Sequence, residues 1–256
     1  MSFRFATLGS GSRGNALLLE TADVRVLVDC GFPARETEKR LAALSVDPQT
    51  LSAIFVTHEH GDHIRGVGAL ARRYQLPVWM TDGTYRAAHY GQLPKLNRLD
   101  CHAGWISMGD LELLPFPVPH DAREPCQFLF QSEGKRLGLL TDTGHITPHI
   151  QQKLLGCDGL ILEFNHDAEL LRNGPYPPRL QARVGGLHGH LSNHQAGNLL
   201  KQVDGSQLQC LVASHLSEKN NTPQKVGQVV EEKAPRLTEV LHFAEQDTQS
   251  HWFEFG

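Results

Sequence analysis

The segment His58-Glu59-His60-Gly61-Asp62-His63 directly follows the apolar run at residues 53–56, which is typical of a buried strand. Four of its six residues are candidate metal ligands: three imidazoles and one carboxylate. In a His-x-His-x-Asp-His turn, alternate imidazoles point one way while the carboxylate and the last imidazole point another. Two cations a few ångströms apart can then activate water between them. The alternative is a polar loop that is rich in His by chance. The segment predicts a dinuclear metal centre.

Length and composition limit the class of protein. The 256 residues suffice for a large core, and we expect a single domain over residues 1–256. A net charge of −4, with His neutral, excludes a globally basic nucleic-acid binder but not a local basic patch. The five cysteines include no Cys-x-x-Cys pair, so we expect reduced thiols in a cytoplasmic protein. A signal-peptide core and a membrane-length apolar run are both lacking, so no membrane partner is expected.

Strand and helix signals alternate along the chain. The predicted strands are residues 3–8, 16–20, 24–29, 53–57, 105–118, 127–141 (with a hairpin turn at 133–135), 159–164, 208–214, 239–243 and 251–255. The predicted helices are residues 35–44, 64–74, 147–155, 193–203 and 223–232. Strands cluster in each half of the chain with helices between them. We therefore predict an α/β (α+β) fold, a four-layer αββα sandwich of two mixed sheets with outer helices.

Three further candidate ligands also follow predicted strands. His120 comes after residues 113–119, Asp142 after residues 137–141, and His215 after residues 211–214. Strand ends are the places where a rigid sheet can direct several side chains at one point. Each residue taken alone is more readily explained as a structural group, above all an Asp that caps a turn. Because the same order of strand and then candidate ligand is repeated, a shared role as metal ligands becomes the better explanation.

This ordered set of residues resembles the metallo-β-lactamase superfamily of metal-dependent hydrolases. Longer stretches resemble the YycJ/WalJ group within it, above all Glu163-Phe164-Asn165-His166-Asp167 and Gly189-His190-Leu191-Ser192-Asn193. The landmarks run from residue 7 to residue 222, so the resemblance covers nearly the whole chain. It implies the αββα fold and a nuclease activity on DNA that proceeds from 5′ ends.

The resemblance also implies an assignment of the ligands. One metal would be held by His58, His60 and His120, the second by Asp62, His63 and His215, and Asp142 would bridge both, with Asp62 counted among the catalytic residues as well. The mixed His and carboxylate set suits zinc, manganese or iron, of which we favour zinc or manganese. Two such ions, two carboxylates and a bridging hydroxide leave a charge of about +1, which attracts an anionic phosphate. The same charge would also tolerate a lactone or a thioester.

His190 resembles the extra His of ribonuclease Z-like enzymes, which is placed to protonate the leaving oxygen. Glu163, at the end of its own predicted strand, is the natural acidic partner. A nucleic-acid alkoxide is a poor leaving group, so its release calls for a general acid more than lactone hydrolysis does. The alternatives are a local hydrogen bond at a helix start for His190 and a tie between two loops for Glu163.

Candidate substrate contacts lie in the second half of the chain. Residues 170–203 contain no Asp or Glu but include Arg172, Arg179 and Arg183. In an acidic protein such a stretch can follow a phosphate backbone, and the alternative is an ordinary exposed Pro-rich segment. The remaining candidates for substrate contact are Asn165, Ser217 and Asn220.

Three functions remain open from the sequence. The first is a DNA exonuclease, or a related phosphodiesterase, that attacks through a metal-bridging hydroxide. The second is a hydrolase of small molecules, such as a cyclic phosphodiesterase, a lactonase or a thioesterase. The third is a non-catalytic regulatory binding protein, against which the intact ligand set argues. The sequence leaves the oligomeric state open, with a dimer among the options.

Overall fold

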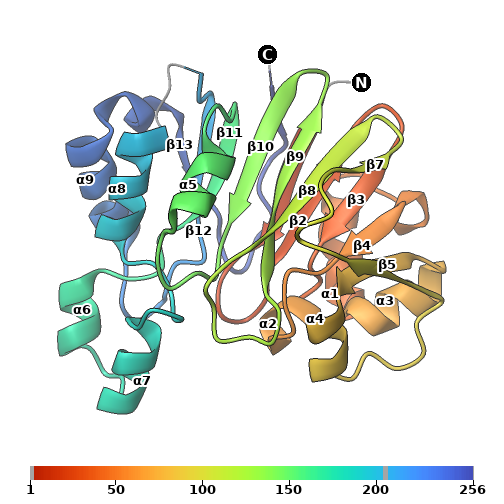
Figure 1. Cartoon of the computed structure of the whole chain (residues 1–256), viewed down its shortest axis with the longest axis horizontal. Coiled ribbons are helices and arrows are strands. Elements are labelled where there is room, and N and C mark those ends of the chain that lie inside the picture. Colours follow the sequence, from red (N-terminus) through yellow and green to blue (C-terminus); the bar gives the residue numbers. More distant parts are fainter. Residues whose placement is uncertain (1–2, 204–206, 256) are drawn as a thin grey trace. The chain divides into compact units, whose positions relative to one another are not determined.

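The structure is a computed structural model that describes residues 3–203 and 207–255 (Figure 1). Its strands form two mixed sheets of seven strands with flanking helices, so the predicted αββα sandwich is confirmed. The chain divides into two compact units, the first Met1–Pro117, Ala122–Gly134 and Ala244–Gly256, the second Val118–Asp121 and Lys135–Phe243. The single-domain organisation over residues 1–256 stays a prediction. Among the described residues, no helix combines the length and apolar character needed to cross a membrane.

The first unit contains the sheet with the strand order β14-β1-β2-β3-β4-β5-β6. Neighbours from β14 to β3 are antiparallel, whereas β3 to β6 run parallel. Every side chain of β2 and β4 is buried, as expected for a sheet that is covered on both faces. The strands are β1 (Arg4–Gly9), β2 (Ala16–Glu20), β3 (Arg25–Val28), β4 (Ala53–Phe55), β5 (Pro77–Thr81), β6 (Lys95–Leu99) and β14 (Phe253–Glu254). The helices are α1 (Ala34–Ala43), α2 (Gly61–Ile64), α3 (Val67–Tyr74) and α4 (Asp82–Ala87), with a 3₁₀ turn η1 (Pro48–Thr50).

The second seven-stranded sheet has the order β13-β12-β11-β10-β9-β8-β7, and its three antiparallel strands belong to the first unit. They are β7 (Ile106–Met108), β8 (Leu111–Pro117) and β9 (Cys126–Ser132), paired in that order. The ring of Phe128 on β9 meets the ring of Phe55 on β4 edge to face, with 6.0 Å between centroids. Both side chains are fully buried, so the two sheets pack face to face within this unit.

The second unit contains four parallel strands in the order β10-β11-β12-β13. They are β10 (Lys135–Leu140), β11 (Gly159–Glu163), β12 (Cys210–Ser214) and β13 (Leu241–Phe243). Parallel neighbours need crossover connections, and the crossovers carry α5 (Pro148–Leu154), α6 (Ala168–Asn173), α7 (Pro178–Val184), α8 (Asn193–Val203), α9 (Pro223–Lys233) and the 3₁₀ helix η2 (Pro235–Val240). Figure 1 shows α5, α8 and α9 beside this sheet. The parallel register brings the carboxyl ends of β10, β11 and β12 to one edge, and the candidate ligands follow there.

Several predicted elements differ from the structure. The predicted strand 105–118 is a hairpin of β7 and β8, because Gly109 takes a φ of +58° between them. The predicted helix 64–74 is interrupted at Gly66, where a Cβ atom would lie 2.2 Å from the carbonyl oxygen of Phe32. The predicted strand 239–243 begins only at Leu241, because η2 precedes it. Five further elements were not predicted from the sequence, because they are short and carry little hydrophobic periodicity: β5, β6, α4, α6 and α7.

Candidate metal centre

The metal loop, residues 58–63 of the first unit, is fixed at the carboxyl ends of β3 and β4. Asp29, which follows β3 with a φ of +60°, accepts hydrogen bonds from the backbone N–H and the hydroxyl of Thr57, both at 2.8 Å. Asp29 is 4% exposed, so these bonds form away from water and hold the two strand ends together. His58 is the next residue after Thr57 and is fully buried. The hydrogen bonds between Asp29 and Thr57 therefore determine where the metal loop begins.

The hydrogen bonds of His58 and His63 define their tautomers. The Thr57 hydroxyl gives its proton to Asp29, so its Oγ1 accepts from Nδ1 of His58 at 3.0 Å. Nδ1 of His63 donates to the Asp29 carboxylate at 2.7 Å. In its neutral form each ring then has an unprotonated Nε2, the state that a metal ligand needs.

The Nε2 atoms of these rings lie against the other predicted ligands of the first unit. Nε2 of His58 is 3.1 Å from Nδ1 of His60, and Nε2 of His63 is 3.5 Å from Oδ2 of Asp62. The structure therefore brings together all four predicted ligands of the metal loop. Imidazole nitrogen and carboxylate oxygen are the donors that zinc, manganese and iron accept, so the set fits a divalent metal.

Asn15 and Gly31 support the metal loop and were not predicted to do so. The Asn15 amide lies 3.3 Å from Oδ2 of Asp62 and 3.2 Å from Nε2 of His63, and its backbone N–H donates to the carbonyl of Asp62 at 2.8 Å. A Cβ atom on Gly31 would lie 1.7 Å from that same carbonyl oxygen, so only glycine fits there. Asp29 carried a usable sequence signal, because it is the acidic last residue of the predicted strand 24–29.

In the second unit, Asp142 lies between three imidazoles. Its Oδ1 is 3.5 Å from Nε2 of His215, 3.6 Å from Nδ1 of His190 and 3.9 Å from Nε2 of His120. Asp142 follows β10 and His215 follows β12, both with positive φ, and both side chains are almost completely buried. Asp142, Glu163, His190 and His215 each offer an atom within 4.8 Å of the others, so they form a candidate ligand group.

His120 is oriented by the backbone. Its Nδ1 donates to the carbonyl of Gly189 at 3.0 Å, because a carbonyl oxygen can only accept. In the neutral ring Nε2 is then the unprotonated nitrogen, and it faces the carboxylate of Asp142. The same use of Nδ1 in both units is the pattern expected of metal-binding histidines. This donor set also fits a divalent metal.

Buried Glu163 and partly exposed His190 form an acid pair in the second unit. Oε1 of Glu163 lies 2.7 Å from Nδ1 of His190, and Oε2 accepts from the backbone N–H of Leu191 at 3.0 Å and of Thr143 at 3.3 Å. Burial opposes ionisation of Glu163, but the adjacent His190 and the hydrogen bonds outweigh it and lower the pKa of Glu163 to about 2. Burial opposes protonation of His190, but Glu163 outweighs it and raises the pKa of His190. The pair therefore favours the protonated form of His190.

Three predicted substrate residues brace the loop after β12. Asn165 donates from its amide to the carbonyl of His215 at 3.1 Å. The hydroxyl of Ser217 accepts from the backbone and the amide of Asn220, both at 3.2 Å, and Ser217 N–H donates to the carbonyl of Asn165. Asn165 therefore holds the backbone of His215, and Ser217 and Asn220 hold the chain that follows it. Contact of the three side chains with substrate stays a prediction.

The three predicted arginines lie on α6 and α7. Arg172 belongs to α6 and lines a cavity, while Arg179 is exposed on α7. Arg183 is also on α7, and its Nε donates to the carboxylate of Asp121 at 2.5 Å. Asp121 directly follows the candidate ligand His120. The basic stretch is therefore an ordered pair of short helices rather than an irregular segment.

Comparisons with known proteins agree with this site. Residues 24–215 match the family model described as the beta-lactamase superfamily domain. The chain is 34% identical over 254 residues to exodeoxyribonuclease YycJ of Bacillus anthracis, covering 96% of each protein. It is 35% identical over 226 residues to exodeoxyribonuclease WalJ of Streptococcus pneumoniae, covering 86% of this chain and 84% of that protein. The metallo-β-lactamase fold protein YhfI from Bacillus subtilis superposes with a TM-score of 0.73 at 17% identity, over 98% of this chain and 99% of YhfI, a likeness of fold.

The family model covers most of the chain and includes every predicted ligand from His58 to His215. The two relatives extend the match over nearly the whole sequence. The chain therefore belongs to the metallo-β-lactamase superfamily and is a metal-dependent hydrolase, with the YycJ/WalJ exodeoxyribonucleases among its relatives.

Proposed function

We propose that this hydrolase is a phosphodiesterase that degrades DNA as an exonuclease from 5′ ends. The observation that carries the proposal is the Glu163–His190 pair, 2.7 Å apart and beside Asp142 in the second unit. A general acid is needed where the leaving group is a poorly stabilised alkoxide, as in nucleic acid, and less so in a lactone or thioester. The two relatives are exodeoxyribonucleases, which supports DNA as the substrate.

We further propose two divalent metals, zinc or manganese, held as the motif order of the family assigns them. One would be bound by His58, His60 and His120, the other by Asp62, His63 and His215, with Asp142 shared. When bound, the ions would supply Lewis acidity and a water activated for attack on phosphorus. Asp29 and the carbonyl of Gly189 hold the imidazoles that would bind them in the required tautomer.

His190 would deliver the proton to the leaving oxygen. Its Nδ1 proton stays in the hydrogen bond to Glu163, so the proton that can be transferred is on Nε2. After transfer the ring is neutral and keeps its Nδ1 bond, so Glu163 holds the ring in place throughout. Arg172, Arg179 and Arg183 would hold the strand through its phosphates. Asn165, Ser217 and Asn220 are the remaining candidates for substrate contact.

The direct test uses the manganese-loaded and zinc-loaded protein with DNA labelled at either end, with RNA, and with bis(p-nitrophenyl) phosphate. Degradation from the 5′ end should release a 5′ label at once as a mononucleotide, while a 3′ label persists in a shortening ladder. The reverse pattern would contradict the polarity. Hydrolysis of bis(p-nitrophenyl) phosphate without DNA cleavage by either metal form would favour a small-molecule hydrolase.

A further inference from the structure

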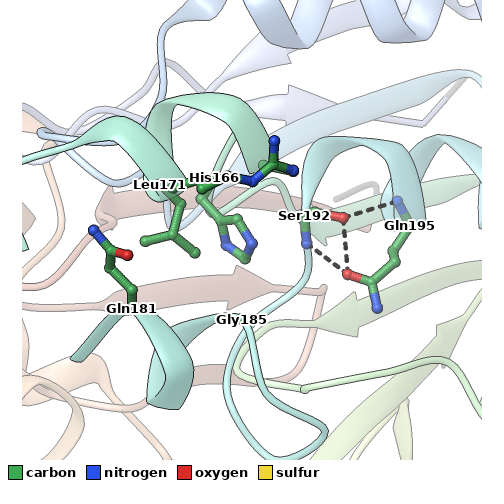
Figure 2. A pocket seen from close by; sticks show the side chains of 8 residues that line it. His166, Leu171, Gln181, Gly185, Ser192 and Gln195 are labelled. Carbon is green, nitrogen blue, oxygen red and sulfur yellow. Dashed lines mark hydrogen bonds between the residues drawn. The ribbon is translucent and has the colours of Figure 1, made fainter. Parts of the chain in front are cut away.

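A cavity of about 310 Å³ lies in the second unit, outside the metal ligand set. Its volume is at the lower end of the roughly 300–1,000 Å³ found for small-molecule sites. Figure 2 shows the imidazole of His166 between Leu171 and the Ser192–Gln195 pair, with Gly185 below the imidazole in this view. Its side-chain lining comes from α6, α7, the start of α8 and the residues just before α6 and α8, mainly from His166, Leu171, Arg172, Gln181, Ser192 and Gln195.

The cavity and the acid pair are built on the same two chain segments. His166 and Ser192 form a parallel bridge, and the carbonyl of His166 accepts from Asn193 N–H at 2.8 Å. Glu163 lies three residues before His166, and His190 two residues before Ser192. Two residues of extended chain span about 7 Å, so a ligand in the cavity would lie within one nucleotide of the acid pair.

The polar groups of the cavity suit a base edge and a phosphate. None of its lining residues carries a carboxylate, and Arg172 supplies a cation. The amide of Gln181 donates to the carbonyl of Tyr176 at 2.9 Å, which leaves the Gln181 Oε1 to accept from a ligand. Gln195 accepts from the backbone N–H and the hydroxyl of Ser192, so its orientation is fixed as well. Carboxamides read base edges and arginine binds phosphate.

His166 contributes a neutral imidazole. Burial lowers the pKa of His166 to about 4, so the ring is uncharged near neutral pH. Its Nδ1 donates to Oδ1 of Asn165 at 3.3 Å, so Nε2 is an acceptor on the cavity side, 4.0 Å from where a Cβ on Gly185 would lie. An acceptor beside the apolar side chain of Leu171 fits the exocyclic amine of a base better than a phosphate.

We propose that this cavity is a nucleotide subsite, which takes the base next to the scissile bond while Arg172 binds a phosphate of the same strand. The proposal rests on the proposed function. A base can enter the cavity only after it leaves the helical stack, so the subsite favours single-stranded or frayed DNA ends.

Two variants test the subsite without touching the proposed metal ligands. Gln181→Ala removes the carboxamide. Gly185→Leu fills the cavity, because Gly185 has a φ of −85° and its Cβ would lie 3.3 Å from Leu171. The matched control is Gln228→Ala, an exposed glutamine on α9. Substrates are a single-stranded oligodeoxynucleotide and bis(p-nitrophenyl) phosphate, and calorimetry measures the binding of 2′-deoxyadenosine 5′-monophosphate.

Gln181→Ala should raise the KM for the oligodeoxynucleotide about tenfold, and Gly185→Leu should raise it further and abolish binding of the monophosphate. Hydrolysis of bis(p-nitrophenyl) phosphate should stay unchanged in both, and the control should match the wild type. An unchanged KM in both variants, or an equal loss with the small diester, would overturn the subsite while DNA cleavage still supports the proposed function. If the wild type cleaves no DNA, the proposed function fails, and equal monophosphate binding by wild type and Gly185→Leu would overturn the subsite separately.

Discussion

Single residues of the candidate centre depend on partners that the ligand pattern does not contain. The carboxylate of Asp29 accepts hydrogen bonds from Nδ1 of His63 at 2.7 Å and from the backbone N–H and hydroxyl of Thr57. The carbonyl of Gly189 receives Nδ1 of His120 at 3.0 Å. These contacts fix tautomers, and a fixed tautomer determines which nitrogen can bind a metal. Asp29 and the carbonyl of Gly189 therefore orient imidazoles of the candidate centre.

Asp29→Asn should weaken metal binding by about 10- to 100-fold, because the amide keeps the shape of the side chain but removes the charge that polarises His63. Competition with a fluorescent chelator measures the affinity. Asp23→Asn is the matched control, since Asp23 is exposed in the turn before β3. Wild-type affinity in Asp29→Asn would show that the carboxylate only holds the loop.

His190→Ala should keep its metal and its fold but lose turnover by about a hundredfold or more on DNA, as expected on removal of a general acid. His188→Ala provides the control, because His188 is exposed two residues away. Activated diesters with a good leaving group should lose much less. Equal losses on good and poor leaving groups would argue against proton transfer by His190.

At the level of secondary structure, α6 and α7 carry the three arginines that are candidates for binding the strand. Helix α6 begins at Asp167, whose side chain accepts from the N–H groups of Glu169 and Leu170. Helix α7 starts with Pro178, in the first-turn position where a missing N–H costs nothing. Arg172 and Arg179 therefore project from ordered backbone, and Arg183 is held by Asp121. An ordered basic surface loses less entropy on binding a strand than a mobile loop would.

Arg172→Gln combined with Arg179→Gln should weaken DNA binding and reduce its salt dependence. Each phosphate contact that is lost lowers the slope of log K against log salt by about 0.7 for single-stranded DNA. Fluorescence anisotropy at several salt concentrations measures both quantities. Lys39→Gln, an exposed residue of α1 with 80% of its side chain accessible, serves as the control. An unchanged slope would mean that the two arginines do not meet phosphates.

At the level of the whole molecule, buried carboxylates and imidazoles are concentrated at strand ends in both units. Asp142 is 2% exposed, Glu163 is fully buried and Asp29 is 4% exposed. Burying such groups is costly unless hydrogen bonds, ion pairs or metals compensate it. A metal that binds only the folded chain adds its binding free energy to stability.

Removal of metal with a chelator should therefore lower the Tm by about 10 °C. A free metal concentration a thousandfold above Kd stabilises the folded chain by about 4 kcal/mol, and for a chain of this size each kcal/mol shifts the Tm by about 2–4 °C. Differential scanning calorimetry of metal-loaded and chelated protein measures the shift, and restoring zinc or manganese should reverse it. A Tm that does not respond to either metal would contradict the dinuclear centre.

The clustering of strands in each half of the chain, with helices between them, was enough to predict the αββα fold. The order and spacing of His58, His60, Asp62 and His63 predicted a metal loop, and their positions after predicted strands added His120, Asp142 and His215 to the candidate ligand set. Such patterns are visible in the chain because each ligand directly follows an apolar strand, and strand ends are local features. The Glu163–His190 partnership was also predictable, since both residues stand in distinctive short motifs.

The partners of those residues became known only from the three-dimensional arrangement. Asn15, Asp29 and the carbonyl of Gly189 act through hydrogen bonds between segments distant in sequence, and no periodicity records such contacts. The cavity around His166 depends on α6 and α7, whose few residues bury little apolar surface and so carry a weak sequence signal. Spacing along the chain specifies which atoms can bind a metal, whereas packing determines their tautomers and the space beside them.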